Sequence, residues 1–118
     1  MKLSILYETT QNNVPIEDLI LTKQEIAQAV SNLARGMPSQ TTGPLLVMLH
    51  KTENKYQLVN GYHRVVETLM RGEDTVTIKN TGIANWKIPK DSELFVPDFN
   101  QRYFGMEEFI EIYELRNL

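Results

Sequence analysis

The order of apolar and polar residues predicts a chain of alternating helices and strands. Thr22 and Glu25 have the spacing of a capping box, so a helix is expected to begin at Thr22. Gly36 and Pro38 are typical of the residues that end a helix. Between these signals the apolar residues recur at helical spacing and form one stripe, made of Ile26, Ala29, Val30 and Leu33.

The middle of the chain predicts a hairpin that leads into a second helix. Residues 45–49 are a continuous apolar run and predict a buried strand, and the alternating residues 56–59 predict its return strand. The charged residues 51–55 have the length of a hairpin connection. A helix is then expected over residues 62–70, with Gly72 as its cap.

The N-terminal part gives weaker signals. Residues 2–7 alternate loosely and predict a short strand, whereas the polar residues 10–13 predict a loop. Residues 14–20 contain a proline and predict an extended or turn segment, and residues 39–43 are polar and turn-rich.

The C-terminal part predicts one more strand and one more helix. Residues 76–79 predict a short strand, and residues 81–97 have no clean period and predict an irregular excursion with at most a short strand near 94–96. Residues 106–116 combine two glutamates in a first turn with a broad apolar face, which predicts a last helix.

Composition limits the class of protein. The chain has 118 residues, 42% of them hydrophobic and 23% charged, which is typical of one globular domain, so residues 1–118 are interpreted as a single α+β domain. No apolar run approaches the roughly 20 residues that span a bilayer, and the N-terminus does not resemble a signal peptide, so a cytoplasmic protein without membrane contact is expected. The absence of cysteine excludes disulfides, thiolate metal sites and cysteine nucleophiles. The net charge of −3 disfavours nucleic acid as a partner.

One turn concentrates the residues that bind anions. Asn60 and Gly61 separate the strand over 56–59 from the helix that starts at Tyr62, and His63 and Arg64 follow in the first helical turn. Free backbone amides and the helix dipole favour an anion at this end, and Arg64 and His63 add side-chain donors there. The pattern therefore predicts an anion cradle. The alternative is that Gly61 only forms the turn and that His63 and Arg64 are solvated.

The same segment resembles the central motif of the ParB/sulfiredoxin-like superfamily. Residues 56–67, Tyr-Gln-Leu-Val-Asn-Gly-Tyr-His-Arg-Val-Val-Glu, are similar to its strand, Gly-x-His-Arg turn and helix. Residues 14–19, 22–33 and 43–47 resemble the entry segment, first helix and following strand of ParB N-terminal domains. The resemblance extends over about residues 14–115 and implies a small mixed sheet flanked by helices.

The resemblance also implies a binding site. It makes Asn60, Gly61, Tyr62, His63 and Arg64 the phosphate-binding turn of a nucleotide site. Asn100 and Arg102, followed by an acidic helix, resemble the segment that completes the nucleotide pocket in ParB proteins. The implied ligand is a nucleoside triphosphate, ATP or CTP, with Mg²⁺. His63 and Glu17 are the candidate catalytic residues, and Glu17 has solvent exposure as its alternative explanation.

Two features of the sequence differ from the family pattern and limit which of the family's functions can be expected. Tyr62 stands where sulfiredoxin has its catalytic cysteine, which excludes sulfiredoxin chemistry. The 118 residues leave no room for the DNA-binding and dimerisation segments of ParB partition proteins. Three functions therefore stay open: a nucleotide-binding domain with NTPase or phosphotransferase activity, a DNA-binding or nuclease protein, and a non-enzymatic protein-interaction or inhibitor module of a phage or mobile element.

Other groups of residues have structural explanations. His50 and His63 are too far apart in sequence for a helical ligand pair, and His50 is expected at an edge or turn. The glutamates of the last helix, Glu107, Glu108, Glu111 and Glu114, suit a solvated face better than a metal site. The aromatic residues of the C-terminal half could stack nucleic-acid bases, but packing is the preferred explanation; they are Trp86, Phe95, Phe99, Tyr103 and Phe104.

Overall fold

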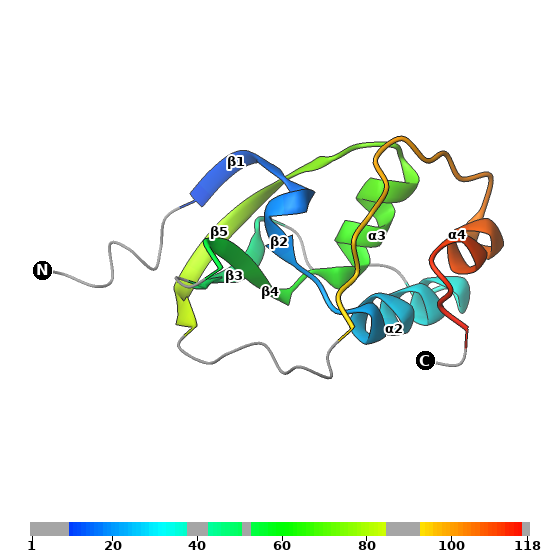
Figure 1. Ribbon diagram of the computed structural model, residues 1–118, viewed down its shortest axis with the longest axis horizontal. Helices are drawn as coiled ribbons and strands as arrows, with labels where there is room; N and C mark the ends of the chain where they lie inside the picture. The colour runs from blue at the N-terminus through cyan, green and yellow to red at the C-terminus, as the bar shows by residue number, and fades with distance from the viewer. Residues whose placement is uncertain (1–9, 38–42, 51–52, 85–92, 117–118) are drawn as a thin grey trace, which may run out of the picture.

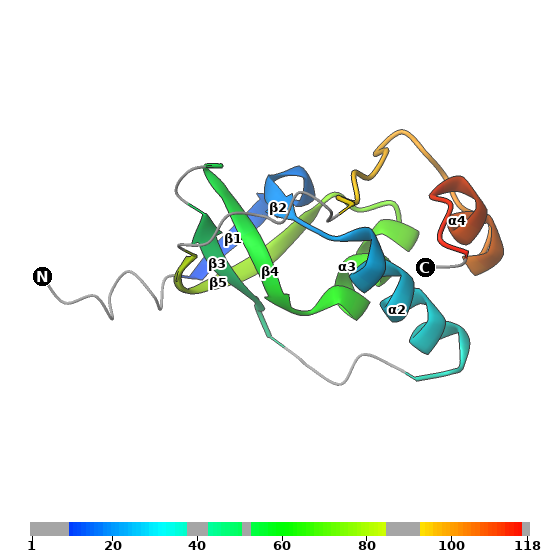
Figure 2. The ribbon, with the colours of Figure 1, turned by 60° about the horizontal axis from the view of Figure 1, so that its bottom comes forward.

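The computed structural model describes residues 10–37, 43–50, 53–84 and 93–116. These residues form a mixed five-stranded sheet with the helices gathered on one side of it (Figures 1 and 2). In chain order the elements are β1 (Thr10–Pro15), the 3₁₀ helix η1 (Ile16–Asp18), β2 (Leu19–Ile20), α2 (Lys23–Ala34), β3 (Leu45–His50), β4 (Lys55–Asn60), α3 (Tyr62–Met70), β5 (Thr75–Ala84) and α4 (Met106–Ile112). The fold is therefore of the expected α+β class.

The sheet has the strand order β1-β5-β3-β4-β2. β3 and β4 form the predicted antiparallel hairpin, and β1 pairs antiparallel with β5. β3 and β5 are parallel, as are β2 and β4. The apolar run of β3 thus fills the centre of the sheet, where a strand has neighbours on both edges.

Helices α2 and α3 begin and end where the sequence predicts. Thr22 caps α2, and its Oγ1 accepts a hydrogen bond from the backbone N–H of Glu25. Both helices end in a Schellman motif, in which a residue of positive φ follows the last turn. This residue is Gly36, at φ 81°, for α2 and Gly72, at φ 77°, for α3.

The core lies between the sheet and the apolar faces of the helices. Ile26, Ala29 and Val30 of α2 are buried, as predicted from the helical stripe, and Leu33 packs partly against them. Val65, Val66 and Leu69 of α3 are also buried. The C-terminal segment joins this core through an aromatic cluster whose members are Phe95, Tyr103, Phe109 and Tyr113.

The interpretation of residues 10–13 as a loop is wrong, because they belong to β1. This strand is an edge of the sheet, so its polar side chains reach solvent while its backbone pairs with β5. Gln11 donates to the Tyr56 hydroxyl, and Thr77 donates to Asn12. A strand stabilised by backbone pairing at an edge needs little apolar alternation.

Three further expectations need correction. β5 extends to Ala84, into the region expected to be irregular, because β3 pairs with β5 as far as Ala84. α4 ends at Ile112 rather than at 116, since Glu114 at φ 54° forms a Schellman motif there. His50 is not an edge or turn residue, because it ends the central strand and is buried.

The aromatic residues also divide into two groups. Phe95 and Tyr103 pack as preferred, whereas Phe104 is almost fully exposed and Phe99 is partly exposed. Between residues 94 and 96 the structure has one bridge, from Leu94 to Thr22. The strand predicted over 2–7, most of the turn-rich segment 39–43, residues 51–52 of the hairpin connection, and Trp86 lie outside the described residues.

Candidate functional site

The turn between β4 and α3 is built around Gly61. Asn60 is the last residue of β4, and Gly61 at φ 118° leads directly into Tyr62, the first residue of α3. A Cβ atom at Gly61 would lie 2.5 Å from Cδ2 of Leu45 and 3.5 Å from Nη2 of Arg64. Glycine is therefore required twice, for its backbone conformation and for the close approach of Leu45.

Arg64 folds back over this glycine. Its Nη1 donates to the carbonyl of Gly43, and its Nη2 donates to the carbonyl of Pro44 at 3.3 Å. Its Nε is buried and has no hydrogen-bond partner among the described residues. No carboxylate in the described part of the chain lies within 4.0 Å of it. Among the described residues, Arg64 is thus a half-buried cation whose hydrogen-bond partners are neutral carbonyl groups.

His63 points to the neighbouring helix α2. Its Nε2 lies 3.3 Å from Nδ2 of Asn32. The Oδ1 of Asn32 accepts hydrogen bonds from Arg35 and Gln28, and an arginine can only donate. Asn32 therefore turns its NH₂ group to His63, whose Nε2 accepts.

Tyr62 points to the start of α2. Burial raises the pKa of Tyr62 above its ordinary value, and the Glu25 carboxylate acts in the same direction. Hydrogen bonds from Thr22 oppose this shift. A hydroxyl that stays protonated in this way anchors the first turn of α3 against α2.

Tyr62 and His63 thus contact α2, and Arg64 contacts residues 43 and 44, while the backbone amides of the same turn have no acceptor within α3. These amides and the guanidinium of Arg64 place positive potential at the end of β4. The arrangement can bind an anion through the amides, and through Arg64 if it exchanges its carbonyl acceptors.

The structure does not bring Asn100 and Arg102 to this turn. Asn100 is exposed and donates its backbone N–H to Asp98. Nη1 of Arg102 lies 3.4 Å from the position of a Cβ on Gly72, at the far end of α3. Nine helical residues separate the two ends, a length of about 13 Å.

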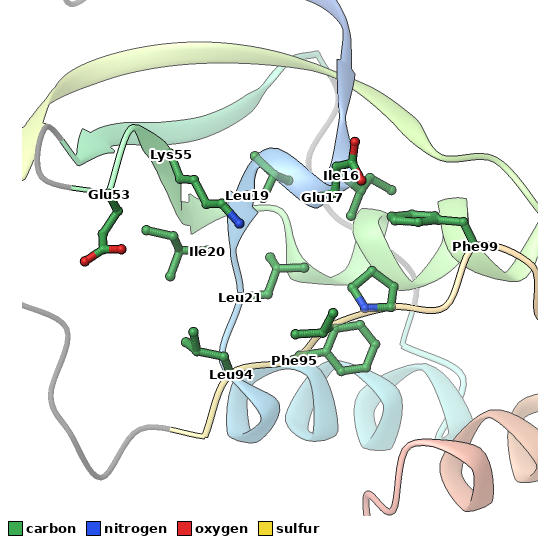
Figure 3. A pocket seen from close by; sticks show the side chains of 12 residues that line it. Ile16, Glu17, Leu19, Ile20, Leu21, Glu53, Lys55, Leu94, Phe95 and Phe99 are labelled. Atoms are coloured by element: carbon green, nitrogen blue, oxygen red, sulfur yellow. The ribbon is translucent and has the colours of Figure 1, made fainter.

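Glu17 is also remote from the Gly61 turn. It belongs to η1 and lines a groove of about 400 Å³ whose lining includes none of residues 60–64 (Figure 3). Among the described residues there is no group of three or more acidic or histidine side chains that could hold a metal ion.

Sequence reasoning missed the partners that Arg64 and His63 have in this structure. The carbonyls of Gly43 and Pro44 could not be found, because a backbone acceptor leaves no mark on residue type. Asn32 lies outside the apolar stripe of α2, and its position in the sequence does not indicate a contact with His63.

Comparison of the chain with protein-family models and with curated proteins gives no match in either case. In the described part of the chain, none of the helices combines the length and the apolar character needed to cross a membrane.

Proposed function

We propose that this chain binds the phosphates of a nucleotide at the Gly61 turn, as a ParB/sulfiredoxin-like domain. The observation that carries the proposal is the state of Arg64. It is a half-buried guanidinium beside a helix N-terminus, without a carboxylate within 4.0 Å among the described residues.

The balance of interactions at Arg64 favours an anionic ligand. Two neutral carbonyls occupy its Nη atoms, and the Nε donor has no partner in the described structure. A hydrogen bond to a charged acceptor contributes more than one to a neutral acceptor, and an unsatisfied buried donor costs about 1–3 kcal/mol. Rotation of the guanidinium onto a phosphate would therefore give its Nη atoms a charged acceptor and give Nε a partner.

The nature of the anion comes from the sequence resemblance. The motif from Tyr56 to Glu67 is similar to the phosphate turn of nucleotide-binding ParB domains, which favours ATP or CTP with Mg²⁺ over a simple anion. The resemblance makes His63 the donor of a second hydrogen bond to the phosphate. Hydrolysis or phosphotransfer is the further step of the proposal and needs a general base. Glu17 lines a groove that contains none of residues 60–64.

Calorimetric titration with ATP, CTP, GTP and ADP, each with and without Mg²⁺, tests the proposal. We expect one nucleoside triphosphate to bind with a Kd below about 1 mM, the upper end of specific ligand affinities. Arg64→Met should weaken it by about 10-fold or more, as expected for loss of a charge-assisted hydrogen bond.

Arg116→Met is the matched control, because Arg116 is an exposed arginine that contacts Glu107 of α4 instead of the turn. It should leave affinity within a factor of about 2, typical of a surface charge. Absence of binding for every nucleotide, or equal affinity of the wild type and Arg64→Met, would reject the proposed function.

A further inference from the structure

A groove whose lining includes none of residues 60–64 has the properties of a peptide-binding surface. It lies between η1 and β2 on one side and residues 94–99 on the other (Figure 3). Its volume is about 400 Å³, within the range of ligand-binding clefts.

The path of the chain explains why the groove stays open. Residues 93–95 pair with residues 21–23 through two backbone hydrogen bonds, from Phe95 to Leu21 and from Lys23 to Glu93. Pro97 follows and has no N–H to continue this pairing. β2 pairs with β4 at its other edge, and no backbone hydrogen bond joins residues 19–20 to residues 96–99 in the described part of the chain.

The rim of the groove is apolar and accessible. Leu94, Val96 and Phe99 have exposed fractions of 46%, 77% and 39%. They come from one short segment and line the same cavity, over a floor that includes Ile16 and Leu21. Three neighbouring large apolar side chains in solvent are typical of an interaction surface.

The charges of the groove specify the partner. Its lining contains two carboxylates, Glu17 and Glu53, and one ammonium group, Lys55, which gives a net charge of −1. None of the three has an oppositely charged group within 4.0 Å among the described residues. Figure 3 shows Glu53 and Lys55 near one end of the groove and Glu17 near the other. A ligand with positive charge at its two ends would neutralise both carboxylates.

We propose that this groove binds an extended segment of a partner protein, in which apolar residues are flanked by lysine or arginine. The apolar side chains would cover Leu94, Val96 and Phe99, and the cationic flanks would lie near Glu17 and Glu53. This surface is separate from the phosphate-binding turn, so its test does not depend on nucleotide binding.

Two synthetic peptides test the proposal. Both have the apolar core valine-phenylalanine-valine; one has lysine flanks and the other has glutamate flanks. We expect the lysine-flanked peptide to bind, measured by fluorescence polarisation, and to shift the NMR amide signals of residues 19–21 and 94–99. The glutamate-flanked peptide should bind at least about 10-fold more weakly, because like charges meet at both ends.

Substitutions then separate the apolar and charged contributions. Val96→Ser should weaken binding about 5-fold or more, as for a central apolar contact. Phe104→Ser is its control, since Phe104 is 95% exposed but lies outside the groove, and should change nothing. Glu17→Gln with Glu53→Gln should weaken binding, and Lys55→Gln should strengthen it, by about 2- to 5-fold each.

Several results would overturn the proposal. These are absence of amide shifts in the groove, preference for the glutamate-flanked peptide, or equal effects of Val96→Ser and Phe104→Ser. A dimer in sedimentation experiments that Val96→Ser dissociates would assign the groove to a second copy of the chain instead.

Discussion

Replacement of Gly61 by alanine separates the two reasons for glycine at the turn. The backbone at φ 118° is unfavourable for any L-residue with a side chain, and residues forced into such regions cost about 1–3 kcal/mol. The new methyl group would also lie 2.5 Å from Cδ2 of Leu45, well inside contact distance. Overpacking of this kind adds about 1–3 kcal/mol. We therefore expect Gly61→Ala to lower the free energy of unfolding by about 2–6 kcal/mol.

Gly36→Ala is the matched control, because Gly36 has φ +81° and nothing within 4 Å of the added Cβ. It should cost only the conformational term, about 1–2 kcal/mol. Urea unfolding followed by circular dichroism gives both values, provided that the denaturant slope stays constant.

In a protein that already carries Leu45→Ala, the overlapping Cδ2 atom is absent. Gly61→Ala should then lower the free energy of unfolding only by the cost of its backbone conformation. Equal losses for Gly61→Ala and Gly36→Ala in the wild-type background would refute the close approach of Leu45. So would the same loss for Gly61→Ala with and without Leu45→Ala.

Two further predictions concern the C-terminal half. Burial and the hydroxyl of Tyr113 raise the pKa of Tyr103 above the ordinary value of 10.0, so the proton is held more tightly in the folded state. The stability that this shift contributes is fully present below pH 10 and is lost as the pH rises above 10. The free energy of unfolding, measured between pH 9 and 11, should therefore fall less for Tyr103→Phe than for the wild type. An equal loss in both proteins would contradict this assignment. Glu114→Gly should stabilise the protein by about 0.5–1 kcal/mol, because Glu114 has φ 54° at the end of α4; a lower urea midpoint would contradict the Schellman motif there.

The elements that the sequence predicted well carry their signals locally. Thr22 and Glu25 define the start of α2, and Gly36 and Gly72 provide the left-handed residues that end α2 and α3. The β3–β4 hairpin follows from one apolar run and one alternating run with a short charged connection. In each case the residues that determine the element lie within it or next to it.

The wrong predictions concern elements that depend on residues far away in the sequence or on a backbone conformation that the residue type does not indicate. β1 consists mostly of polar residues and exists because β5, at least 60 residues later, pairs with it. The extension of β5 to Ala84 depends on pairing with β3 in the same way. Pairing over such distances leaves little trace in local residue pattern. The end of α4 was predicted too late because a glutamate in the sequence gives no sign that its backbone has a left-handed conformation.

The residues of the candidate site also differ in how far they could be predicted from local sequence. Gly61, His63 and Arg64 could be proposed together because one strand-turn-helix segment contains them. Glu17, Asn100 and Arg102 come from other segments, and the structure places them at the groove, in an exposed turn and at the far end of α3. Their positions depend on how those segments pack, which no local pattern specifies.

The most direct test of phosphate binding observes the turn itself. Proton–nitrogen NMR spectra, recorded during titration with Mg²⁺-CTP and Mg²⁺-ATP, report on the backbone amides of Tyr62, His63 and Arg64 and on Nε–H of Arg64. Phosphate bound at this turn predicts saturable shifts of these signals at nucleotide concentrations that leave the groove residues 94–99 unchanged. Signals from Tyr62 to Arg64 that stay fixed at saturating nucleotide would contradict the proposed site.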